Sequence, residues 1–197
     1  EDVPIIIRNY KRNSTTYGVT PELHKGLLEA YYASVSYMDA QVGRILNELE
    51  NLNLVESTIV VFTSDHGYML GHHNKFQKQH LFEESTRVPF ILSVPWMKKQ
   101  HGKATNQITE LIDLFPSLAD LSGLEAPKNL HGASLVPLLK NPSSVKWKKN
   151  LAFTISRNGG ESIRTHQWRY THWSFGYAGE ELYNLKNDPG EFTNLAK

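Results

Sequence analysis

The sequence has 197 residues, 40% of them hydrophobic and 11% aromatic, which is enough to build a packed core and excludes a disordered segment. The formal net charge of +1 gives no electrostatic basis for binding nucleic acid or an acidic membrane surface, and no apolar run approaches the roughly 20 residues of a membrane span. Cysteine is absent, which excludes disulfides, cysteine-ligated zinc and cysteine nucleophiles within this chain.

A long helix is predicted in the first quarter of the chain. Residues 1–19 have mixed polarity without a clear period and contain the glycosylation sequon Asn13-Ser14-Thr15. Thr20-Pro21-Glu22 is a typical helix start, with threonine as N-cap and proline at the first helical position. Apolar residues then recur at helical spacing up to Leu49. This pattern predicts one amphipathic helix that covers a face of a sheet.

Two buried strands are predicted next. The apolar run Ile59-Val60-Val61-Phe62 is continuous, β-branched and aromatic, which predicts a strand buried on both faces of a mainly parallel sheet. A second such strand is predicted over residues 88–94, closed by Pro95. About two dozen residues separate the two strands, and connections of that length are usually functional.

The stretch Ser64-Asp65-His66-Gly67 directly follows the first strand. Binding sites in open α/β sheets lie beyond the carboxyl ends of strands. One hypothesis makes Asp65 a hard oxygen ligand of calcium or magnesium, with Lys78 meeting an anionic substrate. Another is a zinc site built from the histidines of the following loop, although no H-E-x-x-H pattern is present. The structural alternative is a strand-end turn in which Asp65 accepts backbone N–H bonds and His66 is a surface group.

The second half of the chain changes from helical to strand-like patterns. Residues 96–107 are polar and predicted as a loop, and residues 108–122 have helical spacing that Pro116 should kink or break. From about Pro127 the pattern shifts, and the spacing of the later runs suggests an antiparallel meander. These strand-like runs are 151–156, 161–165, 168–174 and 181–184.

Some charged residues in this half have two interpretations. Arg164 and Arg169 could reach a substrate cleft, but pairing with carboxylates is the simpler account. Asp113 could cap the helical segment that follows it. A basic stretch around Trp147 could attract a sulfated polysaccharide, although a solvated loop is the simpler account. Its lysines are Lys140, Lys146, Lys148 and Lys149.

A series of short motifs follows in a fixed order along the chain. They are Ala33-Ser34-Val35-Ser36-Tyr37-Met38-Asp39, Ser64-Asp65-His66-Gly67, Leu70-Gly71-His72-His73, Lys78, Thr86-Arg87-Val88-Pro89, Asp113-Leu114-Phe115-Pro116, His131-Gly132-Ala133-Ser134-Leu135, Ser162-Ile163-Arg164-Thr165 and Glu181-Leu182-Tyr183-Asn184. Together these motifs resemble the type I, formylglycine-dependent sulfatases, from about residue 22 to the end. Within that family the likeness is greatest to the iduronate-2-sulfatase group.

The resemblance implies a fold and an activity. The fold would be the C-terminal part of the alkaline-phosphatase-like sulfatase fold, an α/β domain over residues 1–125 with a mainly parallel sheet and covering helices. A small four-stranded antiparallel subdomain would follow over residues 126–197. The activity would be sulfate-ester hydrolysis on sulfated carbohydrates, as in glycosaminoglycan degradation, with calcium and a formylglycine. The expected location is periplasmic, secreted or lysosomal.

The resemblance also implies roles for individual residues. Asp65 and His66 correspond to metal-facing positions: Asp65 would supply a ligand oxygen, and His66 would be a neighbouring ligand or a hydrogen-bond partner of the nucleophile. Lys78 corresponds to the lysine that neutralises sulfate charge and stabilises the leaving oxygen, so Lys78 and His66 are the candidate catalytic residues. Lys78 and His73 are the candidate substrate-binding residues. Positioned cations and hydrogen-bond donors are the groups that such transfers need.

Other parts of the family pattern are missing from this sequence. No Cys/Ser-x-Pro-x-Arg formylglycine precursor is present, and neither is the acidic pair that completes the metal site. We therefore expect a C-terminal fragment that is inactive alone, binds calcium weakly, and associates with its N-terminal portion or with itself. The alternatives are a phosphodiesterase or phosphonate hydrolase of the same superfold, and a non-catalytic carbohydrate-binding module.

Overall fold

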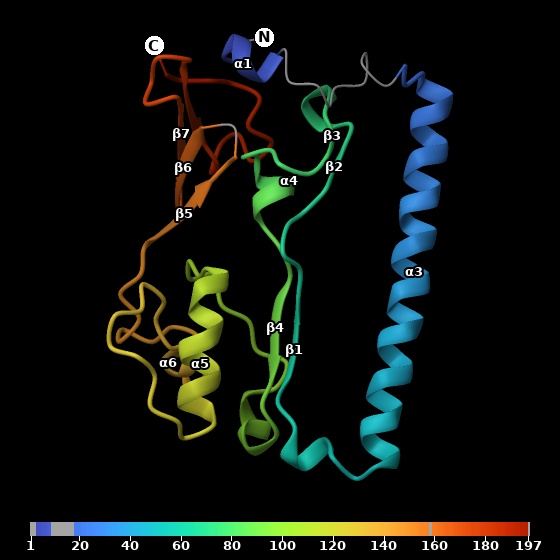
Figure 1. The fold of residues 1–197 in the computed structure, drawn as a ribbon, viewed down its shortest axis with the longest axis vertical. Helices are drawn as coiled ribbons and strands as arrows, with labels where there is room; N and C mark the ends of the chain where they lie inside the picture. Colours follow the sequence, from blue (N-terminus) through green and yellow to red (C-terminus); the bar gives the residue numbers. More distant parts are fainter. Residues whose placement is uncertain (1–2, 9–17, 158, 197) are drawn as a thin grey trace. The chain divides into compact units, whose positions relative to one another are not determined.

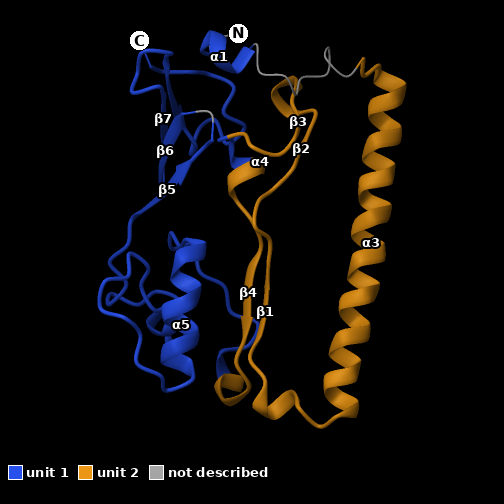
Figure 2. Cartoon of the chain, in the orientation of Figure 1, with its two compact units in different colours: residues 1–8, 81–83, 99–197 blue, residues 9–80, 84–98 orange. Residues whose placement is uncertain are grey.

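The computed structural model describes residues 3–8, 18–157 and 159–196 (Figure 1). They fall into two compact units, which are described separately (Figure 2). Unit 1 comprises residues 1–8, 81–83 and 99–197, and unit 2 comprises residues 9–80 and 84–98. The sequon at Asn13 and most of the predicted irregular N-terminal stretch lie outside the described residues. Within that stretch Ile5–Arg8 forms the short helix α1.

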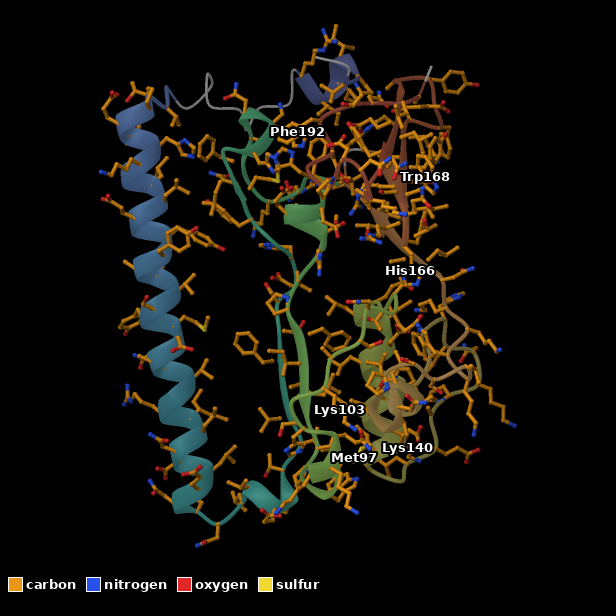
Figure 3. All side chains as sticks on the ribbon, turned by 180° about the vertical axis from the view of Figure 1, so that it is seen from behind. Met97, Lys103, Lys140, His166, Trp168 and Phe192 are labelled. Carbon is orange, nitrogen blue, oxygen red and sulfur yellow. The ribbon has the colours of Figure 1, made fainter. Side chains whose placement is uncertain are left out.

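The longest element of unit 2 is helix α3, Pro21–Asn51. Its start is as predicted, because the Thr20 hydroxyl accepts a hydrogen bond from the Leu23 amide at 3.2 Å and Pro21 opens the first turn. None of its residues is buried, and side chains extend from both sides of the helix (Figure 3). In the described residues the helix therefore buries no face against a sheet, which differs from the prediction. An amphipathic pattern identifies the face to be buried but not the surface that buries it.

Strands β1, Val60–Thr63, and β4, Phe90–Ser93, pair with each other in unit 2. The short 3-10 helix η1, Val55–Ser57, precedes β1. Both strands lie where the sequence predicts them, but none of their residues is fully buried and they pair antiparallel, with Val61 opposite Leu92, whereas strands buried on both faces of a mainly parallel sheet were expected. A continuous apolar run indicates burial and carries no information on strand direction, and mixed sheets commonly include antiparallel pairs.

The connection between β1 and β4 has regular structure of its own. It contains the antiparallel pair β2, Met69–Leu70, and β3, Phe76–Gln77, with a 3-10 turn η2, His72–Asn74, between them and helix α4, Glu83–Thr86, after them. Gly71 has a φ of 107°, and an added Cβ there would lie 2.5 Å from the imidazole of His24. The hairpin therefore needs glycine at this position.

The helical part of unit 1 is built around a buried aspartate. The predicted loop 96–107 starts with the 3-10 helix η3, Pro95–Gln100, of which only residues 99–100 belong to unit 1. After the loop come the 3-10 helix η4, Leu111–Asp113, and the helices α5, Leu114–Leu121, and α6, Val136–Lys140. Residues 108–122 do not form one helix that Pro116 kinks or breaks: α5 begins at Leu114, and Pro116 lies in its first turn, where its missing N–H has no intrahelical acceptor. Asp113 does not cap α5 as predicted. Its carboxylate accepts from the Glu110 amide at 2.8 Å and closes a capping box on η4.

The predicted antiparallel meander is confirmed in unit 1. Its strands, in order across the sheet, are β5, Leu151–Ile155, β6, Gly160–Thr165, β7, Trp168–Trp173, and β8, Glu180–Asn184. Trp173 and Tyr183 are buried on one face, whereas Ile155 is 65% exposed on the other. Figure 3 shows the side chains that crowd this sheet near the labelled Trp168. Among the described residues, no helix combines the length and the hydropathy that crossing a bilayer requires.

Candidate functional site

Asp65 and His66 lie together just after β1. The Nε2 atom of His66 is 3.6 Å from Oδ2 of Asp65, and its Nδ1 is 2.9 Å from the carbonyl oxygen of Gly67. The Asp65 side chain is 85% exposed, so its carboxylate is accessible to a ligand. Ser64 steadies the turn by donating its hydroxyl to the carbonyl oxygen of His66 at 2.7 Å. The turn thus presents one carboxylate and one imidazole at the end of a strand.

The histidines of the following hairpin have structural partners. The imidazole of His72 contacts the carboxylate of Glu84 in α4, and the ring of His73 stacks on that of His72 with centroids 4.8 Å apart. His73 is in the left-handed region, with a φ of 52°. Within the described part of the chain, no group of three or more His, Cys, Asp or Glu side chains is arranged to hold a metal ion. The zinc hypothesis built on these histidines therefore finds no support.

Lys78 lies in the bend after β3, and its side chain is exposed. The two residues that flank it, Gln77 and Gln79, have φ values of 69° and 74°. Residues other than glycine rarely adopt this left-handed backbone conformation, and such strain concentrates at functional sites. The structure thus fixes a strained backbone on both sides of the candidate lysine. Convergence of Lys78 with Asp65 on one anion stays a prediction.

Asp65 and His66 supply only part of what a calcium ion requires. Calcium takes about six to eight oxygen ligands, and Asp65 is the carboxylate that this turn offers to it. His66 adds a nitrogen, which is not a preferred calcium ligand. Asp65 and His66 alone therefore do not form a calcium site, and any such site needs further oxygen ligands.

Sequence reasoning missed a buried ion cluster in unit 1. It joins Glu83 at the start of α4 to Arg164 of β6 and Arg169 of β7, and joins Arg169 to Glu191 near the C-terminus. Nε of Arg169 is 2.5 Å from Oε1 of Glu191, and both side chains are almost wholly buried. The carboxylate pairing expected for the two arginines is thereby confirmed. Nothing in the local sequence singled out Glu83 or Glu191, because their partners are far away in the chain.

The cluster shifts the pKa values of its two glutamates in opposite directions. Burial alone would raise the pKa of Glu83, but the charges of Arg169 and Arg164 outweigh it and lower this pKa. Burial raises the pKa of Glu191 to about 7, even though Arg169 and the amide of Glu83 oppose the shift. Glu191 is fully buried and Glu83 is mostly buried, and the amide N–H of Glu83 donates to the Glu191 carboxylate.

Two residues of the basic stretch around Trp147 have structural contacts, whereas Lys140, Lys146 and Lys148 are exposed. The indole of Trp147 is buried and donates to the carbonyl oxygen of Ile108 at 3.0 Å. Lys149 pairs with Glu110 and Asp113, each at 2.6 Å. Two of the residues that could have attracted a polysaccharide are therefore committed to internal contacts.

Two family models match the chain. One, described as Sulfatase, matches residues 8–124, and the other, described as N-sulphoglucosamine sulphohydrolase, C-terminal, matches residues 71–197. Among curated proteins, human arylsulfatase K is 33% identical over 199 residues, an alignment that covers 95% of this chain and 37% of that protein.

Solved structures similar to this chain include a sulfatase, a protein bound to a sulfated sugar and a phosphonate hydrolase. A 2-O GAG sulfatase superposes with a TM-score of 0.80 at 32% identity, over 90% of this chain and 40% of that chain. A protein solved with its substrate, D-glucosamine-2-N,6-O-disulfate, has a TM-score of 0.75 at 32% identity, over 84% and 35%. A phosphonate monoester hydrolase of Agrobacterium radiobacter has a TM-score of 0.78 at 30% identity, over 89% and 38%.

The chain spans two fifths or less of each of these proteins. The structural likeness and the four-stranded antiparallel sheet confirm the predicted alkaline-phosphatase-like fold class. Each of the two family models covers more than half of the sequence. This chain therefore belongs to the sulfatase family.

Proposed function

We propose that this chain is part of a sulfuric ester hydrolase that removes sulfate from sulfated carbohydrates. The observation that carries the proposal is the segment after β1, where an exposed Asp65 beside His66 is followed by Lys78 between two strained residues. The membership of the sulfatase family supports assigning this chemistry to the segment. The boundary at residue 125 between the α/β domain and the antiparallel subdomain stays a prediction, and so does a periplasmic, secreted or lysosomal location.

The proposed roles follow from the charges that sulfate transfer develops. Asp65 would supply one oxygen ligand to a calcium ion whose remaining ligands lie outside this chain, and His66 would lie beside it. Lys78 would neutralise the sulfate and the leaving oxygen, and His73 would contact the sugar. Fixed cations near developing negative charge are worth a large part of a catalytic barrier. Because one carboxylate holds calcium weakly, we expect the isolated chain neither to bind calcium tightly nor to hydrolyse sulfate esters.

A finer proposal concerns the substrate. The motif order favours the iduronate-2-sulfatase group, and the neighbour named as a 2-O GAG sulfatase supports a 2-O-sulfated glycosaminoglycan unit. The neighbour solved with a disulfated glucosamine supports the wider class of sulfated sugars as substrates. Its substrate has a glucosamine ring in place of a uronate. We therefore place 2-O-sulfated uronate first and sulfated glucosamine second.

The experiment is to express a longer protein that includes this chain together with a formylglycine-generating enzyme, and to screen sulfated saccharides. Asp65→Asn and Lys78→Ala should each lower kcat/KM by roughly 10²- to 10³-fold, which is about 3 to 4 kcal/mol of barrier. Lys98→Ala is the matched control, because Lys98 is an exposed lysine of the same unit whose partner is the exposed Glu56. Full activity of Lys78→Ala would overturn the proposed role of Lys78.

A second candidate function is phosphonate or phosphodiester hydrolysis on the same superfold. The neighbour from Agrobacterium radiobacter favours it, since its similarity is close to that of the sulfatases. Assaying a phosphonate monoester beside the sulfate esters separates the two. If the longer protein has neither a Cys/Ser-x-Pro-x-Arg sequence nor either activity, a non-catalytic carbohydrate-binding module is the better account.

The apolar stripe of α3 supports a further proposal about association. Val35, Met38 and Ile45 are 42%, 41% and 65% exposed, although they share one helical face. An exposed apolar stripe of this length favours either the remainder of the sulfatase fold or a second copy of the chain as its cover. Size-exclusion chromatography with a dye for apolar surface tests this. A monomer at all concentrations that binds no dye would contradict it.

A further inference from the structure

The tip of the β2–β3 hairpin is a turn with an unusual backbone. Gly71, His73 and Asn74 have φ values of 107°, 52° and 59°, all in the left-handed region. The amide of Gly71 donates to the carbonyl oxygen of Lys75 at 2.8 Å, and the amide of Lys75 donates to that of His72 at 2.9 Å. Residues other than glycine hold such a conformation only where the surrounding contacts enforce it. The direction of the His73 side chain therefore depends on what fixes this turn.

The side chain of Glu84 in α4 fastens the turn. Its Oε1 contacts Nδ1 of His72, and because the oxygens of an ionised carboxylate only accept, Nδ1 is the ring nitrogen that carries the hydrogen. Oε2 of Glu84 is buried and has no hydrogen-bond partner among the described residues. The carboxylate thus depends on His72 for its hydrogen bonding, and the contact fixes the plane of the His72 ring.

The ring of His73 rests on that plane. Its centroid is 4.8 Å from the centroid of the His72 ring, and the two ring planes are 30° apart. Both side chains are half-buried. A continuous set of contacts therefore runs from Glu84 through His72 to His73, and all three residues belong to unit 2.

The backbone of α4 meets the turn that carries Asp65 and His66. The amide of Gly67 donates to the carbonyl oxygen of Ser85 at 2.9 Å, and a Cβ on Gly67 would lie 1.9 Å from the carbonyl oxygen of Glu84. The carbonyl oxygen of Gly67 is in turn 2.9 Å from Nδ1 of His66. Glu84 thus contacts this turn through its backbone and the hairpin tip through its side chain.

We propose that Glu84 is a positioning residue for His73: it orients the His72 ring on which the His73 imidazole rests, and so sets His73 relative to the turn after β1. The inference rests on the proposed function where it gives His73 a contact with the sugar. A group that holds the substrate in the ground and transition states alike changes KM more than kcat. Loss of the Glu84 carboxylate should therefore weaken substrate binding and leave the chemical step nearly unchanged.

The contacts are tested first on this chain by NMR of the imidazole groups. The Nδ1 proton of His72 should give a downfield resonance that Glu84→Met, which fills similar space without an acceptor, abolishes. The ring protons of His73 should then move toward the shifts of an exposed histidine. Glu84→Gln keeps an oxygen for this proton and should retain the resonance. Glu56→Met is the control, since Glu56 belongs to an exposed ion pair of the same unit. Unchanged His73 shifts in Glu84→Met would overturn the inference.

The effect on binding is tested in the longer protein by a double-mutant cycle. Glu84→Met should raise KM for the sulfated saccharide about 10-fold with kcat within about twofold, and should cost nothing further in the His73→Ala background. Glu84→Gln should keep KM within about threefold of the wild-type value, because it preserves the acceptor. His72→Phe keeps a ring but removes the donor, so it should raise KM as Glu84→Met does and gives a second route to the same contact.

The outcomes separate this inference from the proposed function. A further 10-fold rise in KM when Glu84→Met is added to His73→Ala would overturn the inference and leave the proposed function standing. Equal losses in Glu84→Gln and Glu84→Met would also overturn it, because the charge of Glu84 would then matter rather than its bond to His72. If His73→Ala leaves KM unchanged, the proposed role of His73 in binding the sugar fails, and the NMR result decides whether Glu84 orients His73.

Discussion

The amide N–H of Gly67 donates to the carbonyl oxygen of Ser85 at 2.9 Å, which fastens the turn after β1 to α4. A Cβ on Gly67 would lie 1.9 Å from the carbonyl oxygen of Glu84, which is backbone and cannot rotate away. Gly67→Ala should therefore push α4 aside. We expect it to lower the free energy of unfolding by about 1 to 3 kcal/mol, measured by urea denaturation.

Gly43→Ala is the matched control for this prediction. Gly43 is in the middle of α3, and an added Cβ there would meet nothing within 4 Å. This substitution should raise helix stability by about 0.5 to 1 kcal/mol, because alanine loses less backbone entropy than glycine. If both substitutions changed the free energy of unfolding in the same direction, the close approach of Gly67 to the Glu84 carbonyl would not be the reason that glycine is needed there.

Local patterns predicted much of this fold. The start of α3 follows from Thr20 and Pro21, and β5 to β8 follow from short strand-like runs with strong turns between them. In each case the residues that determine the element are neighbours in the sequence. The direction of β1 against β4 could not be predicted, because it depends on how the chain returns through the intervening hairpin.

The contacts around the candidate site also include some that the sequence predicts and some that it does not. Asp65 and His66 are adjacent in sequence, so their proximity follows from the chain itself. The hydrogen bond from the Glu83 amide to the Glu191 carboxylate could not be predicted, since the two residues are 108 positions apart. Such pairs form only when distant helices and strands pack together, and a single sequence does not show which elements will pack.

Lys149 compensates a buried carboxylate. Its amine pairs with Asp113 and Glu110, and although burial would lower the pKa of Lys149, these hydrogen bonds outweigh it and raise that pKa. Lys149→Met leaves Asp113, which is fully buried, without its cation. We expect a loss of about 3 kcal/mol in the free energy of unfolding. Because the folded pKa is above 10.5, this loss should be constant between pH 6 and 9.

Lys148→Met serves as the control, since Lys148 is the exposed neighbour in the same stretch. It should change the stability by less than about 0.5 kcal/mol. An equal loss in both variants would mean that the general positive charge of the stretch stabilises the fold, rather than the pairing of Lys149 with Asp113.

Tyr183 donates its hydroxyl to Oε1 of Glu181 at 2.8 Å, and Trp173 donates to Oε2 at 2.7 Å. Burial raises the pKa of Glu181, and these two donors oppose the shift. Tyr183→Phe removes one donor to the ionised form, so the pKa of Glu181 should rise further, which a carbon-13 NMR titration of its carboxyl group measures. The expected stability loss at pH 7 is about 1 to 2 kcal/mol.

Tyr170→Phe provides the comparison. Tyr170 donates to Glu180 at 2.7 Å at the exposed edge of the same sheet, where water can replace the lost hydroxyl. The stability should change by no more than about 0.5 kcal/mol. A fall in the pKa of Glu181 after Tyr183→Phe would show that the hydroxyl favours the protonated carboxyl instead.

Stability should depend on pH through Glu191. Its folded pKa is raised from 4.5 to about 7, because burial disfavours the ionised form and Arg169 recovers only part of that cost. Between pH 4.5 and 7 the folded chain therefore binds more protons than the unfolded chain, so the free energy of unfolding should fall as the pH rises through this window, by on the order of 3 kcal/mol at most. The lowered pKa of Glu83 acts only below pH 4.5, and the raised pKa of Glu181 acts in the same direction as Glu191.

Glu191→Gln isolates this contribution in urea unfolding from pH 4.5 to 8. Glutamine cannot ionise but still offers an oxygen to the Glu83 amide, so the variant should keep only the shallower slope that Glu181 gives. Glu125→Gln, at an exposed position, should keep the full wild-type slope. If Glu191→Gln also kept the full slope, Glu191 would already be ionised throughout the window, and its pairing with Arg169 would fully offset its burial.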